Sequence, residues 1–208
     1  MYAKGQGVLQ DYKTAVKWYR LAAEQRVSLA QTSLGYMYEY GKGVLQDYKT
    51  AVKWYTLAAK QGYATAQTNL GQMYREGQGV LQDDKTAMKW YTLAAKQGLA
   101  LAQYKLGWIF EKGKGVLQDD KTAVKWYTLA AEQGNASAQT NLGVMHGTGR
   151  GLIRDNVYAH MWGSLAASNG NENGGKLRDF VEQKMTSSQI ETAQKIAREC
   201  ISKKYKGC

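Results

Sequence analysis

The sequence predicts an all-α protein, built as an α-solenoid of antiparallel helix pairs and closed by a C-terminal helical cap. Three observations predict this fold class. The segment "GVLQDYKTAVKWY" occurs at Gly7–Tyr19 and at Gly43–Tyr55, and near-copies begin at Gly79 and Gly115, always 36 residues apart. The 208-residue chain contains no proline, which would otherwise interrupt helices. Apolar residues recur at helical spacing within each copy, and a fixed period of this length indicates a solenoid.

Alignment of the chain on itself divides it into units. Identical columns are formed by two glycine series, an aspartate series and a tryptophan series: Gly5, Gly41, Gly77, Gly113 and Gly149; Gly7, Gly43, Gly79, Gly115 and Gly151; Asp11, Asp47, Asp83, Asp119 and Asp155; Trp18, Trp54, Trp90, Trp126 and Trp162. They define a repeat region at 1–170, with a truncated first unit at 1–27 and units at about 28–63, 64–99, 100–135 and 136–170. Residues 171–208 lie outside the period and are predicted to form the cap.

Each unit is predicted to contain two helices. In the unit at 64–99, the first helix covers Ala64–Glu76 and ends in the glycines of Glu76–Gly79, which can adopt positive φ. Asp83 is placed to cap the second helix, Asp84–Gln97. Gly98 then ends that helix, and the next unit begins.

The second helix is amphipathic. Because each residue advances about 100° around a helix, one face carries Ala51, Trp54, Tyr55, Ala58 and Ala59, and the opposite face carries Lys49, Lys53, Thr56 and Lys60. The aromatic face is therefore expected in the core. The tryptophan column is expected to fill the space between neighbouring units, so Trp90→Ala should cost about 3–5 kcal/mol of stability.

The last segment carries the signals of a separate helix. In "SSQIETAQKIARECISKKY", which follows Met185 and Thr186, Ser188 and Glu191 have capping-box spacing. One apolar stripe contains Ile190, Ala193, Ile196, Ala197, Cys200 and Ile201. We therefore expect this helix to shield the last repeat, as terminal elements of solenoids do.

The repeat columns resemble the Sel-one-like repeat family, a branch of the tetratricopeptide-like helical repeats. The motif is complete in one unit at Ala66, Leu70, Gly71, Tyr74, Gly77, Gly79, Val80, Asp83, Ala87, Trp90, Tyr91, Ala94, Ala95 and Gly98. The first unit lacks most of its first helix, and His146 and Gly163 replace tyrosines of the motif in the last unit. The resemblance implies a right-handed superhelix that serves as a protein-interaction scaffold. We expect a bacterial protein that acts as a monomer.

Composition narrows the function classes. No run of about 18 apolar residues is present, so no membrane span is expected. The start "MYAKGQG" has no signal-peptide core, which favours the cytoplasm by default, or the periplasm or secretion if a leader has been removed. Cys200 and Cys208 are the only cysteines, and two free thiols are expected, with a local bridge as the alternative.

Candidate chemistry is sparse, and no catalytic residue, metal ligand or cofactor site is predicted. His146 and His160 are the only histidines, without partners at metal-ligand spacing. An enzyme of the β-lactamase or penicillin-binding type is the alternative, because some cysteine-rich relatives carry that label. Its Ser-x-x-Lys motif is absent. Within the repeats, Thr-x-x-Lys occurs four times, from Thr14, Thr50, Thr86 and Thr122, which indicates architecture because an active site is needed once.

The net charge of +11 raises nucleic acid, a membrane surface or an acidic protein as partners. Two lysine columns would form an exposed lysine ladder: Lys13, Lys49, Lys85 and Lys121, with Lys17, Lys53, Lys89 and Lys125. A solvated face that keeps the repeats in solution is the favoured interpretation. Weak polyanion binding is a further alternative, and specific nucleic-acid binding is not predicted because aromatic stacking platforms are missing from that face.

Partner binding is expected where the units differ, on the first helices. The resemblance to tetratricopeptide-like folds implies that these positions line a concave groove, which would take a protein or peptide. The predicted groove residues are Tyr36, Tyr40, Arg75, Tyr104, Trp108 and Lys112. The aromatic members are typical interface anchors, and Arg75 and Lys112 could pair with carboxylates. The alternative is that these aromatics pack between neighbouring first helices.

Overall fold

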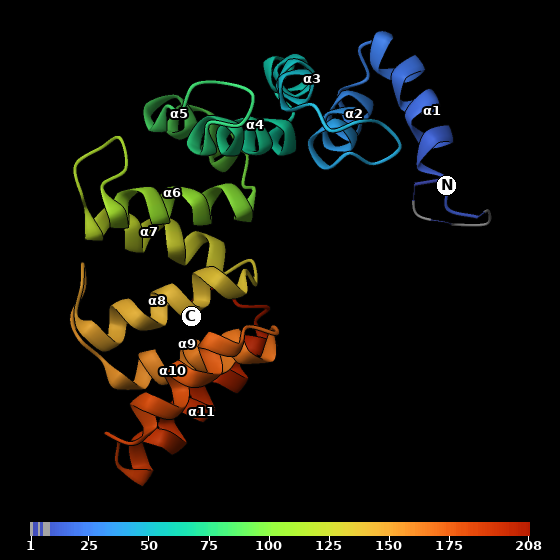
Figure 1. Cartoon of the computed structure of the whole chain (residues 1–208). Coiled ribbons are helices and arrows are strands. Elements are labelled where there is room, and N and C mark those ends of the chain that lie inside the picture. The colour runs from blue at the N-terminus through green and yellow to red at the C-terminus, as the bar shows by residue number, and fades with distance from the viewer. Residues whose placement is uncertain (1, 4, 6–8) are drawn as a thin grey trace. The chain divides into compact units, whose positions relative to one another are not determined.

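The structure, a computed structural model, describes residues 2–3, 5 and 9–208. These residues contain eleven helices and no strand (Figure 1), which confirms the predicted all-α fold. The repeat helices are α1 (Tyr12–Glu24), α2 (Ser28–Tyr40), α3 (Tyr48–Lys60), α4 (Ala64–Glu76), α5 (Asp84–Lys96), α6 (Ala100–Lys112), α7 (Asp120–Ala131), α8 (Ala136–Thr148) and α9 (Asn156–Ser168). They are followed by α10 (Glu172–Glu182) and α11 (Ser187–Ser202).

The chain forms two compact units, an N-terminal unit (Met1–Gln97) and a C-terminal unit (Gly98–Cys208). In the N-terminal unit, α2 packs against α1 and α3, and α4 packs against α3 and α5. In the C-terminal unit, α6 packs against α7, and α8 packs against α7 and α9. The predicted domain division after residue 170 stays a prediction.

Two glycines in each connector have different tasks. Gly77 ends α4 in the left-handed conformation at φ 67°, as predicted. Gly79 also has positive φ, and a Cβ there would lie 2.5 Å from the carbonyl oxygen of Tyr48 at the start of α3. The second glycine therefore lets the connector lie directly on the preceding helix pair, which a side chain would prevent.

An aspartate caps each second helix, as predicted. The Asp83 carboxylate accepts hydrogen bonds from the backbone N–H groups of Lys85 (2.9 Å) and Thr86 (3.1 Å). The Thr86 hydroxyl also donates to Asp83, at 2.6 Å. These bonds to Thr86 lower the pKa of the Asp83 carboxyl. The same aspartate–threonine arrangement recurs at Asp11, Asp47 and Asp119.

We expect the chain to lose stability in acid through these caps. A carboxyl whose pKa is lowered on folding stabilises the protein above its usual pKa, which is 3.8 for Asp83, and this contribution is lost as the pH falls through the lower folded value. Urea unfolding of the wild type and Asp83→Asn at about pH 5 and about pH 2.5 tests this. The variant keeps an acceptor oxygen but does not titrate, so it should lose less stability in acid. Equal losses would contradict the capping account.

The tyrosine column, rather than the tryptophan column, occupies the centre of the repeats. Tyr91 is completely buried, and a Cβ on Gly71 would lie 2.8 Å from its ring. Trp90 is half-buried and packs against a core cluster formed by residues of α3 and α4. The predicted packing of the tryptophan column between units stays a prediction, whereas the expected burial in the core is wrong for Trp90 and for Trp18, which is 60% exposed. Because Gly71 has no side chain, it leaves a space that the ring of Tyr91 fills.

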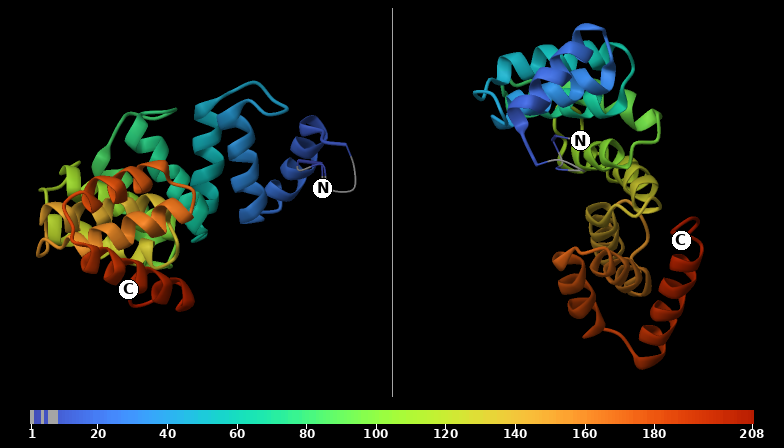
Figure 2. Two further views of the ribbon diagram at one scale, coloured as in Figure 1. Left: turned by 90° about the horizontal axis from the view of Figure 1, so that it is seen from below. Right: turned by 90° about the vertical axis from the view of Figure 1, so that its right-hand side faces the viewer.

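The two C-terminal helices pack on the last repeat of the C-terminal unit. Helix α10 contacts α8 and α9, and α11 contacts α9; the two helices diverge from the turn that joins them (Figure 2). Ala193, Ala197 and Cys200 of the predicted apolar stripe are buried, whereas Ile201 is exposed. The capping box is formed by Thr186 and Gln189, so the predicted pair Ser188 and Glu191 is wrong, because the helix begins one residue before Ser188 and its cap precedes it.

Cys200 and Cys208 form a disulfide, with their Cα atoms 5.5 Å apart. The expectation of two free thiols is therefore wrong. The chain turns back after α11, where Lys204 and Tyr205 adopt positive φ, and this turn returns Cys208 to the helix. The Tyr205 hydroxyl then donates to the side chain of Asn169 at 3.1 Å, which ties the turn to the end of α9.

Candidate partner-binding site

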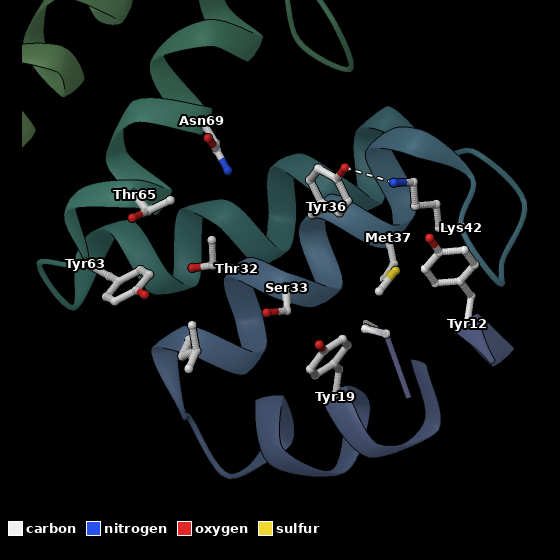
Figure 3. A pocket seen from close by; sticks show the side chains of 12 residues that line it. Tyr12, Tyr19, Thr32, Ser33, Tyr36, Met37, Lys42, Tyr63, Thr65 and Asn69 are labelled. Atoms are coloured by element: carbon white, nitrogen blue, oxygen red, sulfur yellow. Dashed lines mark hydrogen bonds between the residues drawn. The ribbon is translucent and has the colours of Figure 1, made fainter. Parts of the chain in front are cut away.

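The N-terminal unit contains a pocket of about 440 Å³ between α1, α2 and α4 (Figure 3). We call it the tyrosine pocket. Its lining is Ala3, Tyr12, Tyr19, Leu29, Thr32, Ser33, Tyr36, Met37, Lys42, Tyr63, Thr65 and Asn69. The helices bring these side chains together because α2 presents successive turns to the pocket, while α1 and α4 supply its flanks.

Lys42, in the connector after α2, is held among tyrosine rings. Its ammonium donates a hydrogen bond to the Tyr36 hydroxyl at 3.0 Å, which Figure 3 shows, and this bond raises the pKa of Lys42. The same nitrogen lies 4.9 Å from the ring centroid of Tyr36 and 5.6 Å from that of Tyr12. These are cation–π distances, so the positive charge at the pocket is positioned by aromatic side chains.

The rest of the pocket is apolar with a few polar groups. Met37 is buried among the lining residues, and Leu29 is exposed. Hydroxyls of Thr32 and Ser33 and the amide of Asn69 also line it. Lys42 is the one ionised side chain among the described lining residues. A pocket of this composition suits a group with an apolar body and a hydrogen-bond acceptor or a negative charge.

Tyr36 and Tyr40, both predicted site residues, lie together on α2. Their ring centroids are 4.5 Å apart, and Tyr36, 38% exposed, lines the pocket directly. Tyr40 lies beside it, with its ring 6.0 Å from the Lys42 ammonium. Burial, with the nearby Glu39 carboxylate, raises the pKa of the Tyr40 hydroxyl to about 12, so Tyr40 stays a neutral donor.

Arg75 lies on α4 and forms an ion pair with Glu76 at 2.6 Å. It is not among the residues that line the tyrosine pocket. The flanking repeats have glutamates, Glu39 and Glu111, at the position of Arg75.

The other three predicted residues lie on α6 in the C-terminal unit. Tyr104 and Trp108 are half-buried and pack against the core of that unit, and the Tyr104 ring is 6.0 Å from the ring of Tyr127. This packing agrees with the alternative interpretation of these two aromatics. Lys112 pairs with Glu111 at 2.7 Å. Their role in binding stays a prediction.

Several pocket residues were not predicted from the sequence. Tyr12, Lys42 and Tyr63 stand in the connectors or at helix starts, whereas the comparison of variable positions covered the first helices. The signal was present, because the periodic columns of Tyr12 and Tyr63 also vary from unit to unit. Extending the comparison to these columns would have found them.

In the C-terminal unit, His160 is buried and His146 is half-buried. His146 stacks on Tyr158 with ring centroids 5.2 Å apart, and burial lowers its pKa. His160 lies 3.3 Å from Glu182. No group of three potential metal ligands occurs in the part of the chain that the structure describes. A search of the same residues finds no helix long and apolar enough to cross a membrane.

The repeated helix pairs and their shared connectors define a helical-repeat protein. The Sel1 repeat family model matches residues 1–27, 28–63, 64–99, 100–135 and 136–171. The chain therefore belongs to the Sel1 repeat family, which confirms the resemblance seen in the sequence. Proteins of this family generally serve as protein–protein interaction scaffolds.

Solved structures agree with this assignment. A Sel1 repeat protein from Oxalobacter formigenes is 35% identical with a TM-score of 0.83, over 96% of this chain and 84% of that chain. The protective antigen c5321 of uropathogenic Escherichia coli, which displays an SLR fold, is 27% identical with a TM-score of 0.51, over 99% of this chain and 60% of that chain. No curated protein matches.

Proposed function

We propose that the chain is a non-enzymatic scaffold that binds a protein or peptide partner through its first-helix face, with the tyrosine pocket as an anchoring point. The observation that carries this proposal is the pocket itself. It presents four tyrosines and a positioned lysine at one place, and tyrosine is among the residues enriched at binding hot spots.

The geometry of the threonine–lysine repeats supports a structural role rather than an enzymatic one. In each of the four Thr-x-x-Lys segments of the repeats, the threonine hydroxyl donates to the carboxylate of the preceding cap aspartate, at 2.6 Å. In all four repeats the hydroxyl is thus bound to the aspartate that caps the second helix. This use explains the repeated motif without a nucleophile.

The charge distribution bears on the kind of partner. All eight side chains of the lysine ladder are exposed, so weak polyanion binding remains the competing function. The tyrosine pocket adds Lys42, a cation surrounded by apolar surface. We propose a partner with acidic groups next to apolar ones, because it would match the pocket as well as the net charge.

The disulfide bears on the compartment. Disulfides persist mainly in oxidising compartments such as the bacterial periplasm and the extracellular space. The Cys200–Cys208 bridge therefore favours the periplasmic or secreted alternative over the cytoplasmic default.

Affinity capture with the intact chain as bait tests the proposed function. The wild type and Tyr36→Ala are immobilised in parallel, and bound proteins are compared at physiological salt. We expect at least one protein that the wild type retains and Tyr36→Ala loses. If both baits retain the same proteins, and all of them elute in moderately raised salt, the lysine ladder is the working surface and the proposal is wrong.

A further inference from the structure

In two repeats, a buried tyrosine donates its hydroxyl to a glutamate sixteen residues earlier in the chain. The Tyr55 hydroxyl donates to Glu39 at 2.5 Å, and the Tyr127 hydroxyl donates to Glu111 at 2.7 Å. Both tyrosines are completely buried. Burial raises the pKa of each hydroxyl, so each acts as a neutral donor. The repeat thus has a fixed place for a carboxylate against the buried hydroxyl.

The repeat between them has the donor without the acceptor. Sixteen residues before Tyr91 stands Arg75 instead of a glutamate. Tyr91 is completely buried on α5, next to α4, and its hydroxyl has no hydrogen-bond partner among the described residues. Arg75 stands at the repeat position from which Glu39 and Glu111 reach the buried hydroxyl in the flanking repeats. A buried donor without an acceptor is a costly exception in folded proteins.

The Arg75 guanidinium is paired with a neighbouring carboxylate on α4. Its Nη2 atom lies 2.6 Å from Oε1 of Glu76, and the Gln72 amide donates to the same oxygen at 2.6 Å. The Arg75 side chain is 21% exposed, so a group that arrives from solvent can reach it. A guanidinium carries five N–H donors in a planar fork that matches a carboxylate. Two kinds of donor, the tyrosine hydroxyl and the guanidinium, therefore stand at the two repeat positions that hold a donor and an acceptor in the flanking repeats.

We propose that Tyr91 and Arg75 form a binding site for a carboxylate of the partner. The carboxylate takes the place that Glu39 and Glu111 occupy in the flanking repeats, accepts the hydrogen bond of the Tyr91 hydroxyl and pairs with Arg75. This inference rests on the proposed function, because it assigns a chemical group to the partner: an acidic side chain or a C-terminal carboxylate of a bound peptide. The glutamate pairs of the flanking repeats carry no such site, because their own carboxylates fill it.

Three small probes test the site on the intact chain at constant ionic strength. N-acetyl-glutamate amide carries a side-chain carboxylate, N-acetyl-glutamine carries a terminal one, and N-acetyl-glutamine amide carries none. Binding is followed by NMR at the Nε–Hε resonance of Arg75. We expect a saturable shift with at least one carboxylate probe and none with the neutral probe, and the probe that binds identifies the source of the carboxylate.

Variants of the same column supply the controls. Tyr91→Phe should weaken carboxylate binding several-fold, whereas Tyr55→Phe, whose hydroxyl is bound to Glu39, should leave it unchanged. Arg75→Glu should abolish binding and raise the urea midpoint, because it restores the tyrosine–glutamate pair. The proposal would be overturned if the neutral probe shifted the Arg75 resonance as much as the carboxylate probes do. It would also be overturned if Tyr91→Phe and Tyr55→Phe bound the carboxylate probe equally well, or if Arg75→Glu lowered the urea midpoint.

The outcomes separate this site from the proposed function. If the wild type captures a partner through Tyr36 but ignores all three probes, the carboxylate site alone is wrong. If the carboxylate probes bind as expected but no partner depends on the first-helix face, the scaffold proposal alone is wrong.

Discussion

Tyr91→Ala is expected to lower the free energy of unfolding by about 3–5 kcal/mol, the range for emptying a large aromatic site in a core. Tyr91 is completely buried, and its ring lies against the backbone of Gly71. The sequence alone assigns a cost of this size to Trp90. Because Trp90 is half-buried, we expect Trp90→Ala to cost clearly less. Urea unfolding of both variants decides the order, and a larger loss for Trp90→Ala would contradict the packing described here.

A double-mutant cycle checks the contact between Tyr91 and Gly71 directly. A Cβ on Gly71 would lie 2.8 Å from the Tyr91 ring, so Gly71→Ala should cost about 1–3 kcal/mol through overpacking. In the Tyr91→Ala background the ring is absent, and the same change should cost much less. Additive losses would show that the glycine is needed for another reason.

The fold could be predicted from the sequence because the same local signals for helix starts and ends occur in every repeat. Helix Ala64–Glu76 was predicted with the bounds that the structure has, from a glycine end and an apolar stripe. The choice between Trp90 and Tyr91 for the core could not be made, since adjacent residues share the same helix face. Which of the two residues is buried depends on Gly71 of the paired helix. The periodicity of one helix carries no information about its partner helix.

The site was predicted less completely for a related reason. Tyr36 was found because it varies on a first helix, but Lys42 lies in a connector and reaches the pocket through the path of the backbone. The bridge between Cys200 and Cys208 depends on a turn with two positive-φ residues. Neither feature follows from composition or period, because both depend on how the chain turns after a helix ends.

Tyr36→Ala is expected to weaken partner binding about thirtyfold, which corresponds to about 2 kcal/mol, the lower limit for a hot-spot residue. Its ring faces the pocket and helps to hold the Lys42 ammonium. Tyr36→Phe keeps the ring and loses only the hydrogen bond to Lys42, so it should retain most of the affinity. A matching loss in both variants would assign the effect to the hydroxyl rather than to the ring.

The measurement that tests the central claim most directly is the dissociation constant of a captured partner at an ionic strength of about 0.15 M. It is compared between Tyr36→Ala and the double variant Lys53→Ala/Lys89→Ala. Exposed lysines act through screened attraction, so the double variant should lose little affinity, and less as salt is added, while Tyr36→Ala should lose about thirtyfold. If the lysine variant abolishes binding and Tyr36→Ala binds normally, the partner uses the lysine ladder, and the first-helix face is not the binding surface.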